Sequence, residues 1–122
     1  MRLLLDSNSR LNLVRGYGNG EIVVGEQRIT RPLIITPLQL HLDWGAASLP
    51  AVREPDLQAL FDTGAQIILL GAGDTQLFAH AEVRAICRAR GIALECMTLG
   101  AACRTYNILA SEERPVAAGL FP

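Results

Sequence analysis

The sequence predicts an α/β fold in which helices cover a β-sheet. The residues before about Pro50 are β-branched, alternating and rich in turns, whereas the residues after it switch between short apolar runs and helical periodicity. Half of the 122 residues are apolar and 19% are charged, which is the composition of a packed interior. A chain of this length forms one hydrophobic core rather than two. We therefore expect a single domain over residues 1–122, with a β-rich half at about 10–45 and an α/β half at about 50–122.

The β-rich half predicts a meander or a pair of hairpins. Leu11 and Leu13 alternate with polar neighbours, and the pair Asn19-Gly20 tolerates the positive φ angles of a tight turn. Leu38 begins a stretch in which leucine alternates with polar residues, as in a half-buried strand. The extended segments expected in this half are 11–24 with its turn, 27–29, 33–36 and 38–42.

The second half predicts helices and strands in alternation. Pro55 suits the first turn of a helix, and Gly64 and Gly91 suit positions just past helix ends. A continuous apolar run such as QIILL is typical of a strand that is buried on both faces. The crossover from Gln66 to Met97 should make its two strands parallel. The helices are expected at about 55–64, 80–90 and 99–110, and the strands at 66–70, 92–97 and 116–121.

The charged residues exclude several functions. The net charge of −1 leaves no basic surface of the kind that nucleic acid or an anionic membrane attracts. All eleven cationic residues are arginine, which rules out a Schiff-base lysine, a lysine general base and a P-loop lysine. Such arginine usage is typical of a GC-rich bacterial genome. No motif points to a cofactor, and we expect none.

The cysteines and the N-terminus predict the cellular compartment. Cys87, Cys96 and Cys103 are odd in number and lack CxxC spacing, so we expect reduced, small core residues. The start MRLLLDSNSR has three apolar residues before Asp6, too few for a signal peptide. No apolar run approaches the roughly 18 residues that a membrane helix needs. We therefore expect a soluble, cytoplasmic protein without membrane insertion.

Polar side chains gather in the stretch LGAACRTYNIL, residues 99–109. On a helix, Arg104 and Asn107 lie one turn apart on a polar arc, next to the core face that contains Tyr106. The glycine-containing loop after the strand at 66–70 lacks the third glycine of the dinucleotide fingerprint, so a generic strand-end turn is the better interpretation, although the loop lies where open α/β sheets bind ligands. The small-molecule or anion site expected here comprises Gly71, Gly73, Asp74, Arg104, Tyr106 and Asn107.

Cys103 is a candidate for a reactive thiol. It lies in the first turns of the same predicted helix, where the helix dipole favours a thiolate. A nucleophilic cysteine also needs a base, and nothing in the sequence places His41 or His80 beside it. A small packed cysteine is the alternative, and we predict no catalytic residue. His41 and Asp43 share one side of an expected strand, but no metal-ligand spacing occurs, so no metal site is predicted.

A helix stripe and a tryptophan are candidates for a protein-interaction surface. His80, Arg84 and Arg88 recur at every fourth position, so they share one face of the helix at 80–90. That face is either an ordinary solvated surface or a docking surface for an acidic partner. Trp44 either caps the core or, if exposed, marks an interface. An open sheet edge is a third option.

The order and spacing of several segments resemble those of one known family, namely GYGNGEIVV, LIITP, IILLGAG, GIALECM, AACRTYNIL and EERPVAAGLFP. It is the small α/β domain family that contains mitochondrial NADH dehydrogenase complex I assembly factor 3 and the adipogenesis-associated domain protein, together with many uncharacterised bacterial members. The similarity runs from about residue 10 to the C-terminus. Two positions depart from the family pattern, because Thr98-Leu99 replaces a common Asp-Thr pair and Ala79 stands where proline is common.

The resemblance implies a three-layer fold with a central mixed sheet, flanking helices and an N-terminal β-hairpin region of the hammerhead type. It also implies that the last strand is antiparallel to most of the sheet. It implies no activity, because the family has no established catalytic residues. Its mitochondrial member acts in building a respiratory complex, which is a binding role.

Two functions are consistent with these observations. The first is a non-enzymatic protein-interaction or assembly-factor-like domain with a protein partner of unidentified kind. The second is a small-molecule or anion-binding protein, with catalysis left open, whose pocket lies between the Gly71–Asp74 loop and the Cys103–Asn107 helix. In that second function Arg104 binds an anionic group instead of pairing with Asp74 or Glu95.

Overall fold

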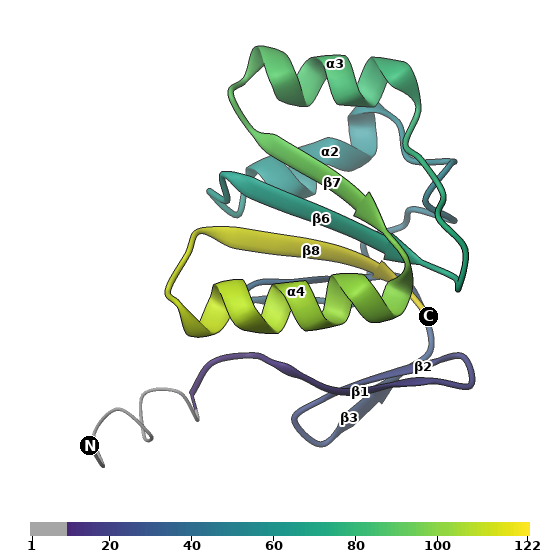
Figure 1. The fold of residues 1–122 in the computed structure, drawn as a ribbon, viewed down its shortest axis with the longest axis vertical. Coiled ribbons are helices and arrows are strands. Elements are labelled where there is room, and N and C mark those ends of the chain that lie inside the picture. The colour runs from purple at the N-terminus through teal and green to yellow at the C-terminus, as the bar shows by residue number, and fades with distance from the viewer. Residues whose placement is uncertain (1–9) are drawn as a thin grey trace.

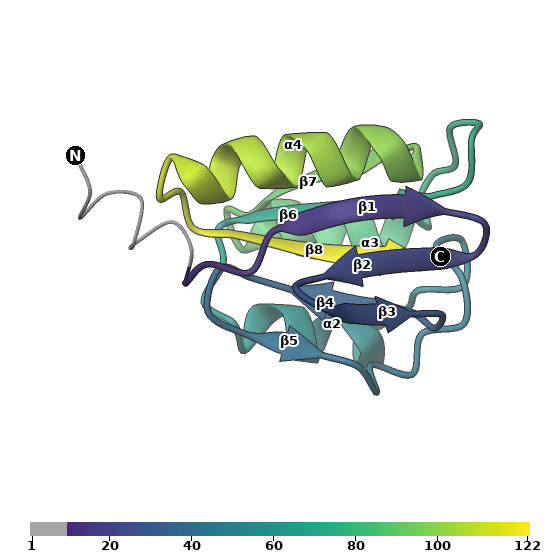
Figure 2. The ribbon, with the colours of Figure 1, turned by 90° about the horizontal axis from the view of Figure 1, so that it is seen from below.

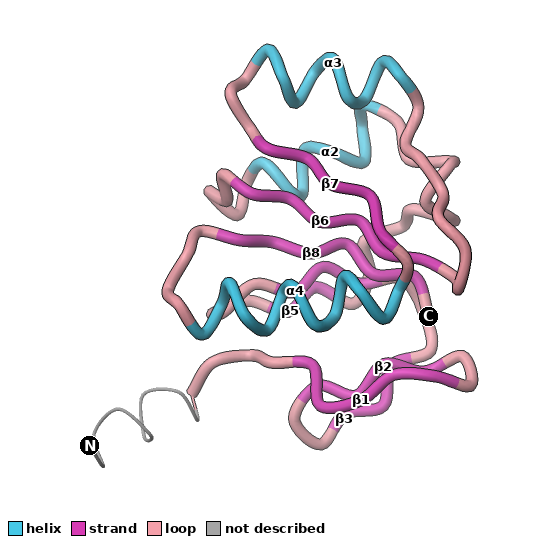
Figure 3. The backbone as a smooth tube through the Cα atoms, in the orientation of Figure 1, coloured by secondary structure: helices cyan, strands magenta, loops and turns pink. Residues whose placement is uncertain are grey.

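The computed structural model describes residues 10–122, in which five strands precede a half where helices and strands alternate, as the sequence predicts (Figures 1 and 3). The prediction that the N-terminus is no signal peptide concerns residues outside this range. The strands are β1 (Val14–Gly18), β2 (Glu21–Val24), β3 (Gln27–Ile29), β4 (Leu33–Ile35), β5 (Leu40–His41), β6 (Ile67–Ala72), β7 (Ala93–Met97) and β8 (Val116–Phe121). The helices are α2 (Glu54–Phe61), α3 (Ala81–Ala89) and α4 (Leu99–Ser111).

A five-stranded mixed sheet with the order β5-β4-β8-β6-β7 forms the centre of the molecule. β6 pairs in parallel with both β7 and β8, so the predicted parallel crossover between residues 66 and 97 is confirmed. β4 pairs antiparallel with β8 and with β5. The antiparallel last strand that the resemblance implies is therefore wrong, since β8 is parallel to β6 and β7, and β4 is the strand that runs against its neighbours. Because α4 carries the chain back along the sheet after β7, the strand that follows runs in the same direction as β7.

Helices cover both faces of the central sheet (Figures 1 and 2). α2 and α3 pack on one face through a buried cluster that includes Leu57, Val83 and Ile68. α4 packs on the other face through a cluster that includes Ala102 and Leu69. Successive residues of β6 thus point to opposite faces, as expected for a strand that is buried on both sides. The three-layer α/β architecture is confirmed.

The N-terminal strands form a second sheet, antiparallel in the order β1-β2-β3, which packs beside α4 (Figure 2). Asn19 and Gly20 have φ angles of 54° and 77°, so the predicted tight turn joins β1 to β2. This sheet is the β-hairpin region that the resemblance implies.

The strand expected over residues 38–42 is shorter in the structure. β5 comprises Leu40–His41, and Leu38 is 82% exposed. Thr36 Oγ1 accepts hydrogen bonds from the N–H groups of Leu38 and Gln39, at 3.3 and 2.9 Å. These bonds hold the residues in a turn, which local alternation of leucine and polar residues does not reveal.

Local capping sets where the helices that border the candidate sites begin. Thr98 is the N-cap of α4, and its Oγ1 accepts a hydrogen bond from the Ala101 N–H at 3.3 Å. His80 is the N-cap of α3, and its Nδ1 accepts from the Glu82 N–H at 3.2 Å. Gly91 follows α3 with a φ angle of 72°, the left-handed conformation that glycine adopts at low cost.

Candidate functional site

A groove of about 520 Å³, which we call the strand-end groove, opens at the carboxyl ends of the parallel strands β6, β7 and β8. The β1–β2 turn and the first turn of α4 form its walls. The connections that leave β6 and β7 lead to helices on opposite faces of the sheet, the arrangement at which open α/β sheets bind ligands. Its lining residues include Tyr17, Asn19, Gly73, Asp74, Thr98 and Arg104.

Arg104 is exposed at this groove and is held there by a tyrosine. Its Nη1 donates a hydrogen bond to Tyr17 Oη at 2.8 Å, which joins α4 to β1. Within residues 10–122, Arg104 forms no ion pair with Asp74, Glu95 or any other carboxylate. Its charge is therefore available to an anion, although Asp74 lines the same groove and weakens that attraction.

Asn107 and Tyr106 belong to the framework rather than to the groove. Asn107 Oδ1 accepts from the Val14 N–H at 2.8 Å, and its Nδ2 donates to the Val14 carbonyl, also at 2.8 Å. Tyr106 is fully buried, and its hydroxyl donates to the Asn12 carbonyl at 2.7 Å. Burial raises the pKa of the Tyr106 phenol. Both side chains fix β1 and its approach to α4, so neither points into the expected ligand site.

The two glycines of the β6 loop have different roles. Gly73 lines the groove, and its φ angle of 64° favours glycine. Its carbonyl accepts from the Leu99 N–H at 2.9 Å and so ties the loop to the start of α4. Gly71 lies within β6, where an added Cβ would be 2.3 Å from Cβ of Ala102. Gly71 thus permits close contact between β6 and α4 and does not line the groove.

Cys103 is buried on the side of α4 that faces the sheet, with 2% of its surface exposed. Burial raises the pKa of its thiol to about 12, and the charge of Arg104 offsets only part of that effect. The neutral thiol therefore predominates at physiological pH, and the helix N-terminus does not produce a nucleophile here. The structure supports the packed cysteine rather than the reactive one.

The basic stripe predicted on the helix at 80–90 divides into a cap and a pair of arginines. The His80 ring is engaged in the N-cap of α3. Arg84 and Arg88 are exposed, and within residues 10–122 neither forms an ion pair. Together with Ile92 and Leu94 they line a groove of about 460 Å³ between α3 and β7. We call this the α3–β7 groove.

The α3–β7 groove runs beside an open sheet edge. β7 is the outermost strand of the central sheet on this side (Figure 1). Among the described residues only β6 pairs with it, so its other edge has no strand partner. The sequence indicates the arginine stripe but not its neighbour, because local periodicity does not reveal which strand ends the sheet.

Trp44 is a core residue. It is 9% exposed, and its ring packs on Phe121 with the ring centroids 5.3 Å apart. Its Nε1–H donates to the Asp56 carbonyl at 2.9 Å, so the polar end of the ring is also satisfied. Gly119 makes room for the ring, since an added Cβ there would lie 2.7 Å from the nearest indole atom. Trp44 therefore caps the core and does not form the exposed patch that was one alternative.

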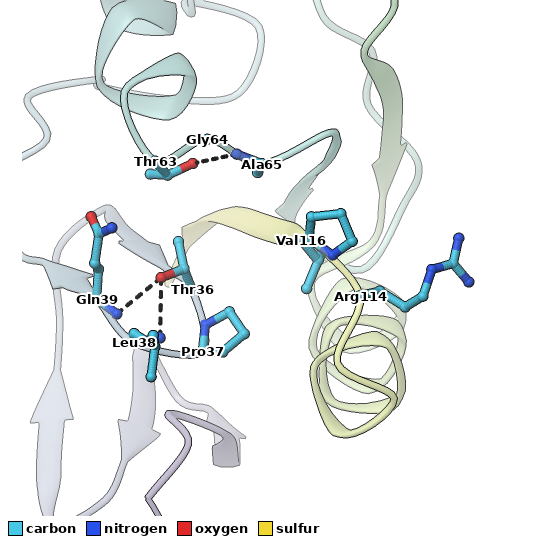
Figure 4. Close-up of a pocket in the computed structure, with 10 residues that line it drawn as sticks. Thr36, Pro37, Leu38, Gln39, Thr63, Gly64, Ala65, Arg114 and Val116 are labelled. Carbon is cyan, nitrogen blue, oxygen red and sulfur yellow. Dashed lines mark hydrogen bonds between the residues drawn. The ribbon is translucent and has the colours of Figure 1, made fainter.

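A smaller cavity of about 180 Å³ lies at the opposite end of the sheet from the strand-end groove (Figure 4). Its hydroxyl groups are engaged, because Thr36 Oγ1 and Thr63 Oγ1 both bond to nearby backbone groups. Figure 4 shows the Arg114 side chain directed away from the cavity. The cavity thus presents no free charged group that would orient a ligand.

The described residues contain no assembled metal-binding group. No three or more His, Cys, Asp or Glu side chains converge within residues 10–122. The ring of His41 forms a hydrogen bond with Gln39 Oε1 at 2.9 Å instead of pairing with Asp43. The same range holds no helix with the length and apolarity that crossing a bilayer requires.

These features define an α/β domain with a mixed central sheet, a groove at its parallel strand ends and a basic strip beside one open edge. The chain belongs to the family described as "Protein of unknown function (DUF498/DUF598)", which matches residues 14–121. The family resemblance read from the sequence is confirmed by this match and by the relatives that follow.

A Danio rerio protein named NADH dehydrogenase 1 alpha subcomplex assembly factor 3 is 35% identical over 109 residues, 88% of this chain. The chain spans about 60% of the length of that relative. A Francisella tularensis protein named "13 kDa major membrane protein" is 28% identical over 82% of each chain. A solved structure of a Xanthomonas campestris protein is 38% identical, with a TM-score of 0.81 over 88% of this chain and 82% of that one.

Proposed function

We propose that the chain is a non-enzymatic, assembly-factor-like domain that binds a protein partner through the α3–β7 groove. The observation that carries this function is the position of Arg84 and Arg88, two exposed cations without ion pairs among residues 10–122, beside an unpaired strand edge. Ile92 and Leu94 add apolar surface to the same groove. A groove that combines cations with apolar side chains suits an acidic partner, because charge guides the encounter and apolar burial adds affinity.

Family kinship supports a binding role. The Danio rerio relative is named as an assembly factor, and assembly requires contact with other proteins. Two side chains suited to chemistry are engaged in the framework, since Cys103 is buried and Asn107 binds the backbone of β1. The polar groups that remain exposed on α3 favour recognition of a partner.

Charge reversal in the groove is the test of this function. A photoreactive residue at Ala93, which lines the groove, is expected to crosslink a native partner in cells that make the protein. The variant R84E/R88E is expected to lower that crosslinking at least about tenfold, because like charges across an interface cost several kcal/mol. The matched control R15E/R31E reverses two exposed arginines of the N-terminal half and should keep the crosslink. Equal crosslinking by R84E/R88E, or none by the parent protein, contradicts the proposal.

The strand-end groove favours a second function, the binding of a small anionic ligand. Arg104 lines this groove at the carboxyl ends of three parallel strands and carries no ion pair within residues 10–122. Inorganic phosphate and citrate are the probes, and saturable shifts of the Gly73 and Gly100 amide resonances are the expected result. Arg104→Gln should weaken the fitted affinity about tenfold, whereas Arg114→Gln, remote from this groove, should not change it. Shifts that never saturate, or that persist in Arg104→Gln, speak against this function.

Three other expectations stay predictions. A reducing, cytoplasmic compartment is supported by the free thiols of Cys87, Cys96 and Cys103. The lack of nucleic-acid binding is supported by a net charge of −1. A single domain is supported by the way residues of both halves enter both buried clusters.

A further inference from the structure

We propose that β7 accepts an extended, acidic segment of the partner protein as an added strand of the central sheet. This mode of recognition rests on the proposed function, because it uses the same α3–β7 groove. It goes further in naming the form of the bound segment: an extended chain whose backbone pairs with β7 while its acidic side chains reach Arg84 and Arg88.

The backbone of β7 is oriented for such pairing. The Ala93 N–H donates to the Gln66 carbonyl at 3.0 Å, which fixes Ala93 as a residue whose polar groups face β6. In a parallel ladder the residues alternate, so Ala93, Glu95 and Met97 face β6 and the residues between them face outward. The N–H and carbonyl of Leu94 and the N–H of Cys96 therefore point to the open edge, where no other strand of the described residues pairs with them.

One side chain closes part of this edge. Gln76 lies in the loop between β6 and α3, and its Nε2–H donates a hydrogen bond to the Cys96 carbonyl at 2.9 Å. Natural proteins protect open strands from unwanted pairing by such local cover. Gln76 covers the carboxyl end of β7 and leaves the groups of Leu94 open. The stretch of β7 that an added strand can reach is thus short, which favours pairing with one specific segment over aggregation through long strands.

The charges of Arg84 and Arg88 favour a different protein, rather than a second copy of this chain, as the partner of β7. If two copies paired through β7, a twofold axis would bring both copies of Arg84 and Arg88 to the same edge. Four cations with no carboxylate partner among residues 10–122 would then face one another, which opposes that pairing. The same cations attract an incoming strand that carries aspartate or glutamate next to the groove.

Selection of short random peptides displayed against the full chain tests the strand. The enriched peptides are expected to combine acidic residues with β-branched or aromatic ones and to slow amide exchange at Leu94 and Cys96. R84E/R88E should bind these peptides at least about tenfold more weakly. Two N-methylated forms of an enriched peptide separate backbone pairing from side-chain contacts, because both keep every side chain. The form methylated on the amides that face β7 should bind at least about tenfold more weakly than the form methylated on the amides that face away.

Each result separates the added strand from groove binding in general. If both N-methylated forms bind equally while R84E/R88E still binds weakly, the added strand is overturned and the proposed function survives. If no peptide is enriched, or the enriched peptides leave Leu94 and Cys96 exchange unchanged, β7 does not accept strands. Gln76→Ala is a further test, because it frees the Cys96 carbonyl and should tighten peptide binding about three- to tenfold. Gln58→Ala, on α2, should change nothing; weaker or equal binding by Gln76→Ala counts against the inference.

Discussion

Gly71→Ala is expected to lower the free energy of unfolding by about 3 kcal/mol or more. An added Cβ would lie 2.3 Å from Cβ of Ala102 and 3.3 Å from Cδ2 of Leu120. The first contact is far below any distance that real Cβ atoms adopt, and the partner is a short side chain that has no rotamer to escape into. The strain is relieved only if α4 moves away from β6, which opens the cluster on that face of the sheet.

Equilibrium unfolding in urea measures this effect, and two variants of the same chain serve as controls. Gly16 lies in β1 without a positive φ angle, and apart from its chain neighbours no residue has an atom within 4 Å of an added Cβ, so Gly16→Ala should change stability by less than about 0.5 kcal/mol. Ala102→Gly removes the opposing methyl group. Because glycine inside a helix itself costs about 1 kcal/mol, the double variant G71A/A102G should lose at least about 1.5 kcal/mol less than the two single losses added together. Additive losses in the double variant would show that contact with Ala102 is not the cause.

Gly71 also shows where prediction from the sequence reaches its limit. The sequence places Gly71 and Gly73 together after a buried strand, and both were candidates for ligand contact. Only Gly73, with its φ angle of 64°, lines the groove. The role of Gly71 depends on which residue of α4 lies above it, and that alignment is set by packing between segments about thirty residues apart in the chain.

The elements themselves follow largely from local sequence. Helix α4 forms over the range predicted for it, and the continuous apolar runs form β6 and β8, both buried. Properties that depend on neighbours in space were not predictable in the same way. The direction of β8 follows from the crossover through α4, and the turn at Leu38 follows from the hydroxyl of Thr36.

The candidate site divides along the same line. The sequence identified Arg104 as the residue to examine, and the structure places it at a groove. Its partner Tyr17 was not predicted, because 87 residues separate the two in the chain. The position of Tyr17 beside the predicted turn at Asn19-Gly20 was the only local sign of that contact. The same holds for Arg84 and Arg88, whose stripe is visible in the sequence while the open edge of β7 is not.

Asn107→Ala is expected to lower the free energy of unfolding by about 2–4 kcal/mol. The side chain forms two hydrogen bonds to one residue, accepting from the Val14 N–H and donating to its carbonyl, each at 2.8 Å. Through these bonds the start of β1 pairs with a side chain of α4. Alanine leaves both backbone groups of Val14 without their partner, while Val14 itself stays 7% exposed.

Hydrogen exchange distinguishes loss of this anchor from general destabilisation. The Val14 amide should exchange at least about tenfold faster in Asn107→Ala and should open at a lower free energy than the amides of β6, which exchange only when the whole domain unfolds. Asn107→Asp keeps the acceptor and loses the donor, so it should retain part of the protection at Val14. Ile108→Ala is the matched control on α4, because Ile108 is 58% exposed and its loss should leave the Val14 amide protected. If the Val14 amide and the β6 amides show the same free energy of opening in Asn107→Ala, β1 does not detach before the core unfolds and Asn107 is not a local anchor. In that case the N-terminal sheet and the central sheet open as one cooperative unit.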